Sequence, residues 1–150
     1  MSVNANILRS KINNLLRELE EVRPQELVLA CKEQLSLVRL RIQNDATLAD
    51  GSLLGTYSPA YLKQRPKKKS SDINLTDTGL MWKETGVDIV FVNETKATVA
   101  IVGTSARSQD LIGYHSERFG NILEASEEEV KKLKRASTKR VTKIINKYLK

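Results

Sequence analysis

Apolar residues recur every three or four positions near the start of this chain. They mark one helical face from Ala5 to Val22, with the members Leu8, Ile12, Leu15, Leu16, Leu19 and Val22. Pro24 interrupts the run. The residue before a proline avoids helical geometry, whereas proline itself fits a first helical turn. The pattern therefore predicts a helix ending near Val22, a second helix starting at Pro24, and a helical hairpin over residues 1–45.

The second predicted helix has a wider apolar surface than the first. Its main face consists of Leu27, Cys31, Leu35, Val38 and Ile42. Val28, Leu37 and Leu40 widen that face, so we expect this helix to be covered on two sides.

Residues 46–75 read as an extended loop, because turn formers such as Asp50-Gly51, Gly55 and Ser58-Pro59 are frequent in them. Loops of this length inside small domains usually have a function. Tyr57 and Tyr61 are candidate anchors, so we expect an ordered first half and an exposed, lysine-rich second half.

Strand signals appear only in residues 76–125. Val87–Val92 and Thr98–Val102 are rich in β-branched residues, and a short polar turn separates them, which predicts a β-hairpin ending at Gly103. A helical turn is expected around Leu80 to Trp82. A short helix is expected over Ser108–Phe119, closed by Gly120.

Residues 126–150 predict a basic helix. Ser126 and Glu129 have the spacing of a capping box, and the helix would bury a face formed by Val130, Leu133, Val141, Ile144, Ile145 and Tyr148. The order helix, helix, long loop, hairpin and helix indicates an α+β fold in one domain, residues 1–150.

The net charge of +7 is unevenly placed along the 150 residues. Residues 126–150 carry nine Lys and Arg against three Glu, and a loop cluster consists of Lys63, Arg65, Lys67, Lys68 and Lys69. Such clusters suit phosphate contact or an acidic protein neighbour. No sequence signature of a nucleic-acid reader accompanies them.

Catalytic chemistry has little support in the residues. His115 is the single histidine, and zinc would require more ligands of the right type. Ser108, Asp110, Ser116 and Glu117 crowd one short segment, which is not how a triad is assembled. His115 reads instead as a partly buried or interface residue beside Tyr114 and Phe119. We therefore expect no enzyme, no cofactor and no metal, with a hydrolase using His115 as a distant alternative.

The remaining bulk features favour a cytosolic chain. Cys31 is the one cysteine, so an intramolecular disulfide is excluded and a buried thiol is expected. The first residues lack the pattern of a signal peptide, and no run approaches the roughly 20 apolar residues of a membrane span.

Three stretches in order resemble motifs of the neck and tail-completion proteins of tailed bacteriophages, which include the Mu-type virion morphogenesis proteins. Gly55–Tyr61 followed by Arg65 is similar to the family's tyrosine-serine loop. Leu75–Leu80 is similar to its entry to the sheet, and Tyr114–Gly120 to its aromatic-histidine-acid-aromatic-glycine motif. After Gly120 the usual proline-arginine pair is replaced by Asn121-Ile122-Leu123.

This resemblance implies a structural subunit of a head-to-tail connector ring, with six or twelve copies around the DNA channel. Its partners would be copies of itself and neighbouring neck, connector and tail proteins, and the subunit would be made in the host cytoplasm and reside in the virion at the head-tail junction. Neck and tail-terminator positions both stay open. The alternative is a small basic nucleic-acid-binding protein. The candidate interface or DNA-facing residues are Tyr57, Tyr61, Lys63, Arg65, Lys67, Lys68, Lys69, Tyr114, His115 and Phe119.

Overall fold

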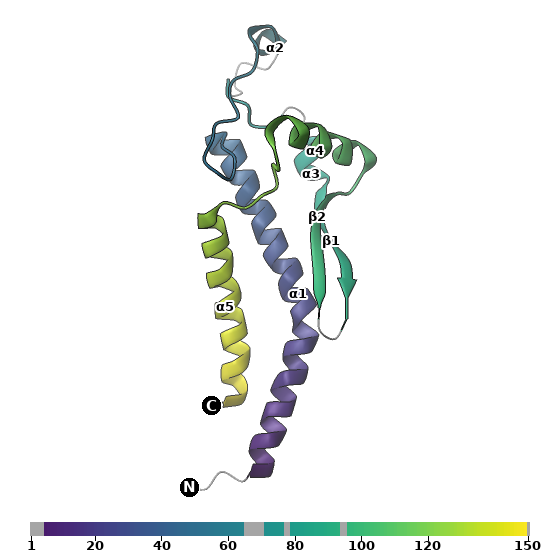
Figure 1. The fold of residues 1–150 in the computed structure, drawn as a ribbon, viewed down its shortest axis with the longest axis vertical. Coiled ribbons are helices and arrows are strands. Elements are labelled where there is room, and N and C mark those ends of the chain that lie inside the picture. The colour runs from purple at the N-terminus through teal and green to yellow at the C-terminus, as the bar shows by residue number, and fades with distance from the viewer. Residues whose placement is uncertain (1–4, 65–70, 77–78, 94–95, 150) are drawn as a thin grey trace.

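The computed structural model describes residues 5–64, 71–76, 79–93 and 96–149, and one long helix runs along most of its length (Figure 1). The elements in chain order are α1 (Ala5–Asp45), α2 (Pro59–Gln64), α3 (Leu80–Lys83), β1 (Thr85–Val92), β2 (Ala97–Gly103), α4 (Ala106–Phe119) and α5 (Glu127–Leu149). Helices and a small antiparallel sheet share this chain, so the predicted α+β class is confirmed.

The predicted helix break at Pro24 is wrong, because α1 continues through it. An internal proline removes one helical hydrogen bond and crowds a carbonyl one turn earlier, at a cost of about 3 kcal/mol. α5 binds α1 on both sides of this point. Lys147 pairs with Glu18 at 2.8 Å, and Arg140 pairs with Glu26 at 2.6 Å. Tertiary contacts therefore outweigh the local penalty, and the predicted helical hairpin is replaced by a single helix.

The segment after α1 is more ordered than an extended loop. Ala46 ends α1 with a φ of 52°, and its carbonyl accepts a hydrogen bond from the Leu54 amide at 2.9 Å. Thr47 and Leu53 form an isolated antiparallel bridge inside this turn. α2 follows, so the first half of the region is ordered as predicted but contains an unpredicted helix. The lysine-rich stretch of residues 65–70 lies outside the described residues.

The predicted hairpin is confirmed as the two-stranded sheet. β1 and β2 pair antiparallel from Thr85 opposite Gly103 onward, with an irregularity between Ile89 and Phe91. The hairpin lies alongside α1 (Figure 1), and both of its strands contact that helix.

α4 begins immediately after the sheet, and its first turn lies very close to the end of β2 at Gly103. The Ser108 amide donates to Ser105 Oγ at 3.1 Å, and the Ser105 amide donates to Ser108 Oγ at 3.2 Å. A Cβ at Gly103 would lie 2.6 Å from Ser108 Oγ, so only glycine fits. α4 closes at Gly120, as predicted, although it starts two residues earlier than the sequence indicated.

α5 runs antiparallel to α1 and starts with the predicted capping box (Figure 1). The Glu129 amide donates to Ser126 Oγ at 3.3 Å, and the Ser126 amide donates to Glu129 Oε2 at 2.7 Å. One part of the predicted face is wrong, since Val130 is 50% exposed while Glu129 is buried. Glu129 is buried because it meets a cation from α1, described below.

The apolar core sits at one end of the molecule, around the last part of α1. Its buried members are Val38, Ile42, Leu54, Ile73, Leu75, Met81, Trp82 and Ile122. α3, α4 and the segment after α1 gather at that end (Figure 1). Among the described residues, no helix is both long enough and apolar enough to span a bilayer.

Candidate functional site

A pocket of about 360 Å³ lies where three distant stretches of the chain meet. The segment from Thr56 into α2 contributes Thr56, Tyr57, Ser58 and Tyr61. The segment before α3 contributes Ile73 and Leu75, and α4 contributes Tyr114, His115, Arg118 and Phe119. The first and third of these overlap the resemblance motifs Gly55–Tyr61 and Tyr114–Gly120, whereas the motif Leu75–Leu80 contributes Leu75 alone. The structure therefore brings residues of distant motifs into one place.

Backbone contacts hold the first two stretches together. The Tyr57 amide donates to the Ser71 carbonyl at 3.0 Å, and the Ile73 amide donates to the Gly55 carbonyl at 2.9 Å. Gly55 has a φ of +92°, a conformation that side chains with a Cβ rarely adopt. This short ladder fixes the entry to α2, where Tyr61 follows on the pocket side.

Aromatic rings form much of the pocket wall. The ring centroids of Tyr57 and Tyr61 lie 4.9 Å apart, with planes tilted by 36°. On α4, His115 lies edge-on to Tyr114 at 5.3 Å and roughly parallel to Phe119 at 6.2 Å. Such geometries are the favoured arrangements of aromatic pairs. The wall is therefore preorganised for apolar or planar groups.

His115 is half-buried in this wall, and burial is the main reason why its pKa lies below the usual value of 6.5. The nearby charge of Arg118 lowers the pKa of His115 further. Its Nδ1 atom is buried and has no hydrogen-bond partner within the described part of the chain. The ring thus packs among aromatic side chains without a hydrogen bond to orient it on the Nδ1 side.

The structure brings together half of the predicted site residues. Those that line the pocket are Tyr57, Tyr61, Tyr114, His115 and Phe119. Lys63 is exposed in the last turn of α2, outside the pocket lining, and Arg65 with Lys67–Lys69 lies outside the described residues. Arg118 was not predicted, although it lies four residues after Tyr114 and therefore on the same helical face.

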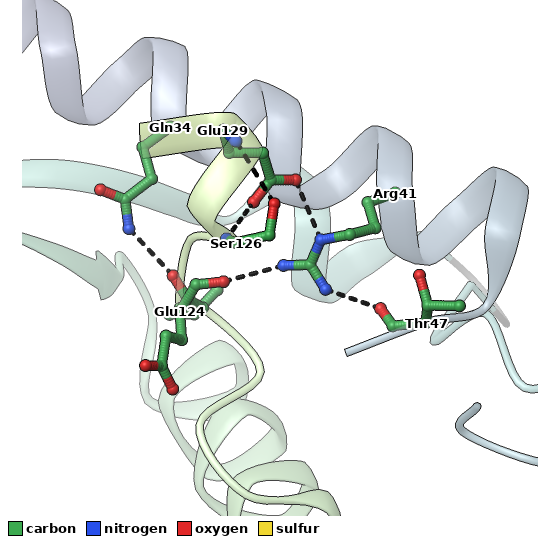
Figure 2. A network of polar contacts seen from close by, with 7 residues as sticks. Gln34, Arg41, Thr47, Glu124, Ser126 and Glu129 are labelled. Carbon is green, nitrogen blue, oxygen red and sulfur yellow. Dashed lines mark hydrogen bonds and ion pairs between the residues drawn. The ribbon is translucent and has the colours of Figure 1, made fainter. Parts of the chain in front are cut away.

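A second feature missed from the sequence is a polar network that binds the start of α5 to α1 (Figure 2). Arg41 Nε lies 2.9 Å from Glu129 Oε1, and the two side chains are only 12% and 7% exposed. Arg41 also donates to the carbonyls of Thr47 at 2.7 Å and Glu124 at 2.8 Å. One guanidinium thus joins α1, the turn after it and the cap of α5.

Ion pairs continue this attachment along α5. Arg140 binds Glu33 at 2.8 and 3.2 Å and Glu26 at 2.6 Å, and these hydrogen bonds, that of Glu33 first, raise the pKa of Arg140. Hydrogen bonds from Lys147 and then Tyr148 lower the pKa of Glu18. Part of the basic charge of α5 is therefore paired with carboxylates of α1 within the subunit.

Apolar side chains are exposed at two places far from the core. The first is the N-terminal half of α1, where Ile7, Leu8, Ile12 and Leu16 are exposed. The second is the far end of the hairpin, where the consecutive residues Ile89–Val92 of β1 are exposed. The β2 residues from Ala97 to Val102 are only partly exposed, so the uncovered apolar surface there belongs to β1.

The comparisons with known proteins provide no family assignment. No protein-family model matches the chain, and no solved structure matches it. A catalase-peroxidase from Serratia proteamaculans is 36% identical over 66 residues, which is 43% of this chain. The chain covers only 9% of the length of that enzyme, so the likeness is local.

Among the described residues, no group of three or more His, Cys, Asp or Glu side chains is placed to hold a metal ion.

Proposed function

We propose that this protein is a structural subunit of a phage head-to-tail connector, in the neck or in a tail-completion ring around the DNA channel. The proposal assigns it no reaction. Its work would be to bind copies of itself and neighbouring proteins of the junction.

The uncovered N-terminal half of α1 carries this proposal. Among the described residues, the last ion pair between α5 and α1 is at Glu18, and α1 continues from there to Ala5, past the end of α5 (Figure 1). A helix end without tertiary packing frays, because most helical stability in proteins comes from packing of an apolar face. Each large aliphatic side chain that becomes buried contributes about 1.5–3 kcal/mol. A neighbouring copy that covers Leu8 and Ile12 would stabilise both the helix and the assembly.

A closed ring also requires two unlike surfaces on each subunit, so that one copy binds the next head to tail. The exposed end of the hairpin, Ile89–Val92, offers a second surface that differs in shape from the helix. Residues of two resemblance motifs, together with Leu75 from the third, line one pocket, and this proximity adds support to the proposal.

The test is the assembly state of the purified protein, measured by sedimentation velocity over a wide concentration range and by negative-stain microscopy. We expect closed rings or ring-sized species. Replacing Leu8 and Ile12 with Lys should abolish them, because charges would enter the contact. The control is Leu53→Lys, at an apolar residue that is 75% exposed on the turn after α1. Unchanged assembly in the double variant would refute the role given to this surface.

A further inference from the structure

α1 and α5 leave an open groove between them. It has a volume of about 400 Å³, and its floor includes Leu37 of α1 together with Leu133 and Ala136 of α5. Leu40 lies four residues after Ser36, another lining residue, and therefore on the same side of α1. Leu40 is 55% exposed. The groove and its extension thus form an apolar surface on the second half of α1, which the sequence predicted would be covered on two sides.

The rim of this groove is positively charged on both sides. Exposed Lys32 lines it on α1, and exposed Lys132 lines it on α5. The acidic residue of the lining is Glu33, whose carboxylate is bound by Arg140 at 2.8 and 3.2 Å. That pairing offsets part of the negative charge of Glu33, although the same guanidinium also binds Glu26 at 2.6 Å. An aliphatic floor between lysines results.

We propose that this groove binds an acidic amphipathic helix of a partner protein. Two antiparallel helices with an apolar groove between them are completed by a third helix, whose aliphatic stripe packs into the groove. Glu and Asp beside that stripe would meet Lys32 and Lys132, so the charge sets the partner's composition. The inference deepens the proposed function, since it rests on that function for the identity of the partner as a component of the junction.

Nucleic acid fits this surface less well than a helix does. Phosphates would be attracted by the lysines, but single-stranded binding sites normally add aromatic rings for base stacking. The floor residues Leu37, Leu133 and Ala136 are aliphatic and would stay hydrated under a phosphate backbone. A helix uses both the floor and the rim.

The experiment measures binding of a labelled synthetic helix with a leucine stripe flanked by glutamates, by fluorescence anisotropy at low and at moderate salt. A shuffled peptide of identical composition and a short DNA duplex serve as comparison probes. Two variants address the groove: Leu40→Ser for the apolar surface and Lys32→Glu with Lys132→Glu for the rim. Their matched controls are Leu53→Ser and Lys131→Glu with Lys134→Glu, which change the same residue types outside the groove lining.

We expect the striped peptide to bind and the shuffled peptide to bind at least tenfold more weakly, and each groove variant to reduce affinity by roughly tenfold. The controls should change affinity less than twofold. Circular dichroism of each variant establishes that the fold is retained.

Equal binding of both peptides, equal loss in groove and control variants, or no peptide binding would overturn the proposal. DNA binding that the rim variant abolishes and Leu40→Ser leaves unchanged would overturn it in favour of a nucleic-acid surface. The peptide-binding assay does not measure ring assembly. A failure of the groove proposal can therefore be distinguished from a failure of the proposed connector function.

Discussion

The Arg41–Glu129 pair gives the sharpest test of how the two long helices are held together. Replacing Arg41 with Met keeps most of the side-chain length but leaves a carboxylate that is 7% exposed without its cation. It also removes the donor from the carbonyls of Thr47 and Glu124. Breaking one side of a buried pair costs about 3–5 kcal/mol, and we expect Arg41→Met to lower the free energy of unfolding by that amount.

Glu129→Gln should cost less, because glutamine can still serve the capping box with Ser126. It exchanges a charged hydrogen bond for a neutral one, a loss of about 1–2 kcal/mol. The double variant should be more stable than the sum of the single losses predicts. A coupling energy of about 1–3 kcal/mol is expected for groups in direct contact.

Urea unfolding followed by the fluorescence of Trp82 is the assay. Trp82 is the one tryptophan and is buried in the core, so its emission reports loss of that core. The control pair is Lys131 with Glu127, at 4.0 Å and with side chains 69% and 93% exposed. Lys131→Met should cost less than about 0.5 kcal/mol. A cost for Arg41→Met no larger than this, or a coupling near zero, would refute the reasoning.

Three further predictions concern single groups. The pKa of His115 is lower in the folded state than the usual 6.5, so its stabilising effect is complete at neutral pH and is lost as pH falls through about 6.5 toward the folded pKa; thermal melts should show His115→Gln to be less acid-sensitive than the wild type between about pH 7.5 and 5, a window that brackets this titration. Cys31 is only partly buried, so the predicted buried thiol is wrong in degree, and this partial burial raises the pKa of Cys31; the native protein should therefore react with a maleimide more slowly than urea-unfolded protein does, and equal rates would contradict that effect. A connector subunit should bind DNA weakly, whereas tight, steeply salt-dependent binding that disappears when Lys67, Lys68 and Lys69 are all changed to Ser would favour the nucleic-acid-binding alternative.

The sequence predicted elements whose signals are local. The hairpin, the helix ending at Gly120 and the Ser126–Glu129 capping box each depend on neighbouring residues, and all three are present. The predicted helix break at Pro24 was wrong because the course of the chain there depends on α5. That helix, more than 100 residues away in the sequence, binds α1 on both sides of Pro24. Helix propensity estimated from neighbouring residues does not include such long-range contacts.

For the candidate site, too, local motifs could be predicted from the sequence and long-range contacts could not. Tyr57 and Tyr114 were identified as candidates from their own motifs, but the pocket that joins them requires the fold. Arg41 was missed because an arginine at that spacing reads as a solvated residue. Its burial follows from Glu129, which is 88 residues further along the chain.

Because the core surrounds only the last part of α1, the helix should not open as one unit. Amide exchange is expected to be slowest near Val38 and Ile42, faster where α1 contacts α5 outside the core, and fastest from Ala5 to Leu16. A partner that covers the exposed N-terminal end would slow exchange there first. The long helix would then act as a graded reporter of assembly, readable residue by residue while the core remains unchanged.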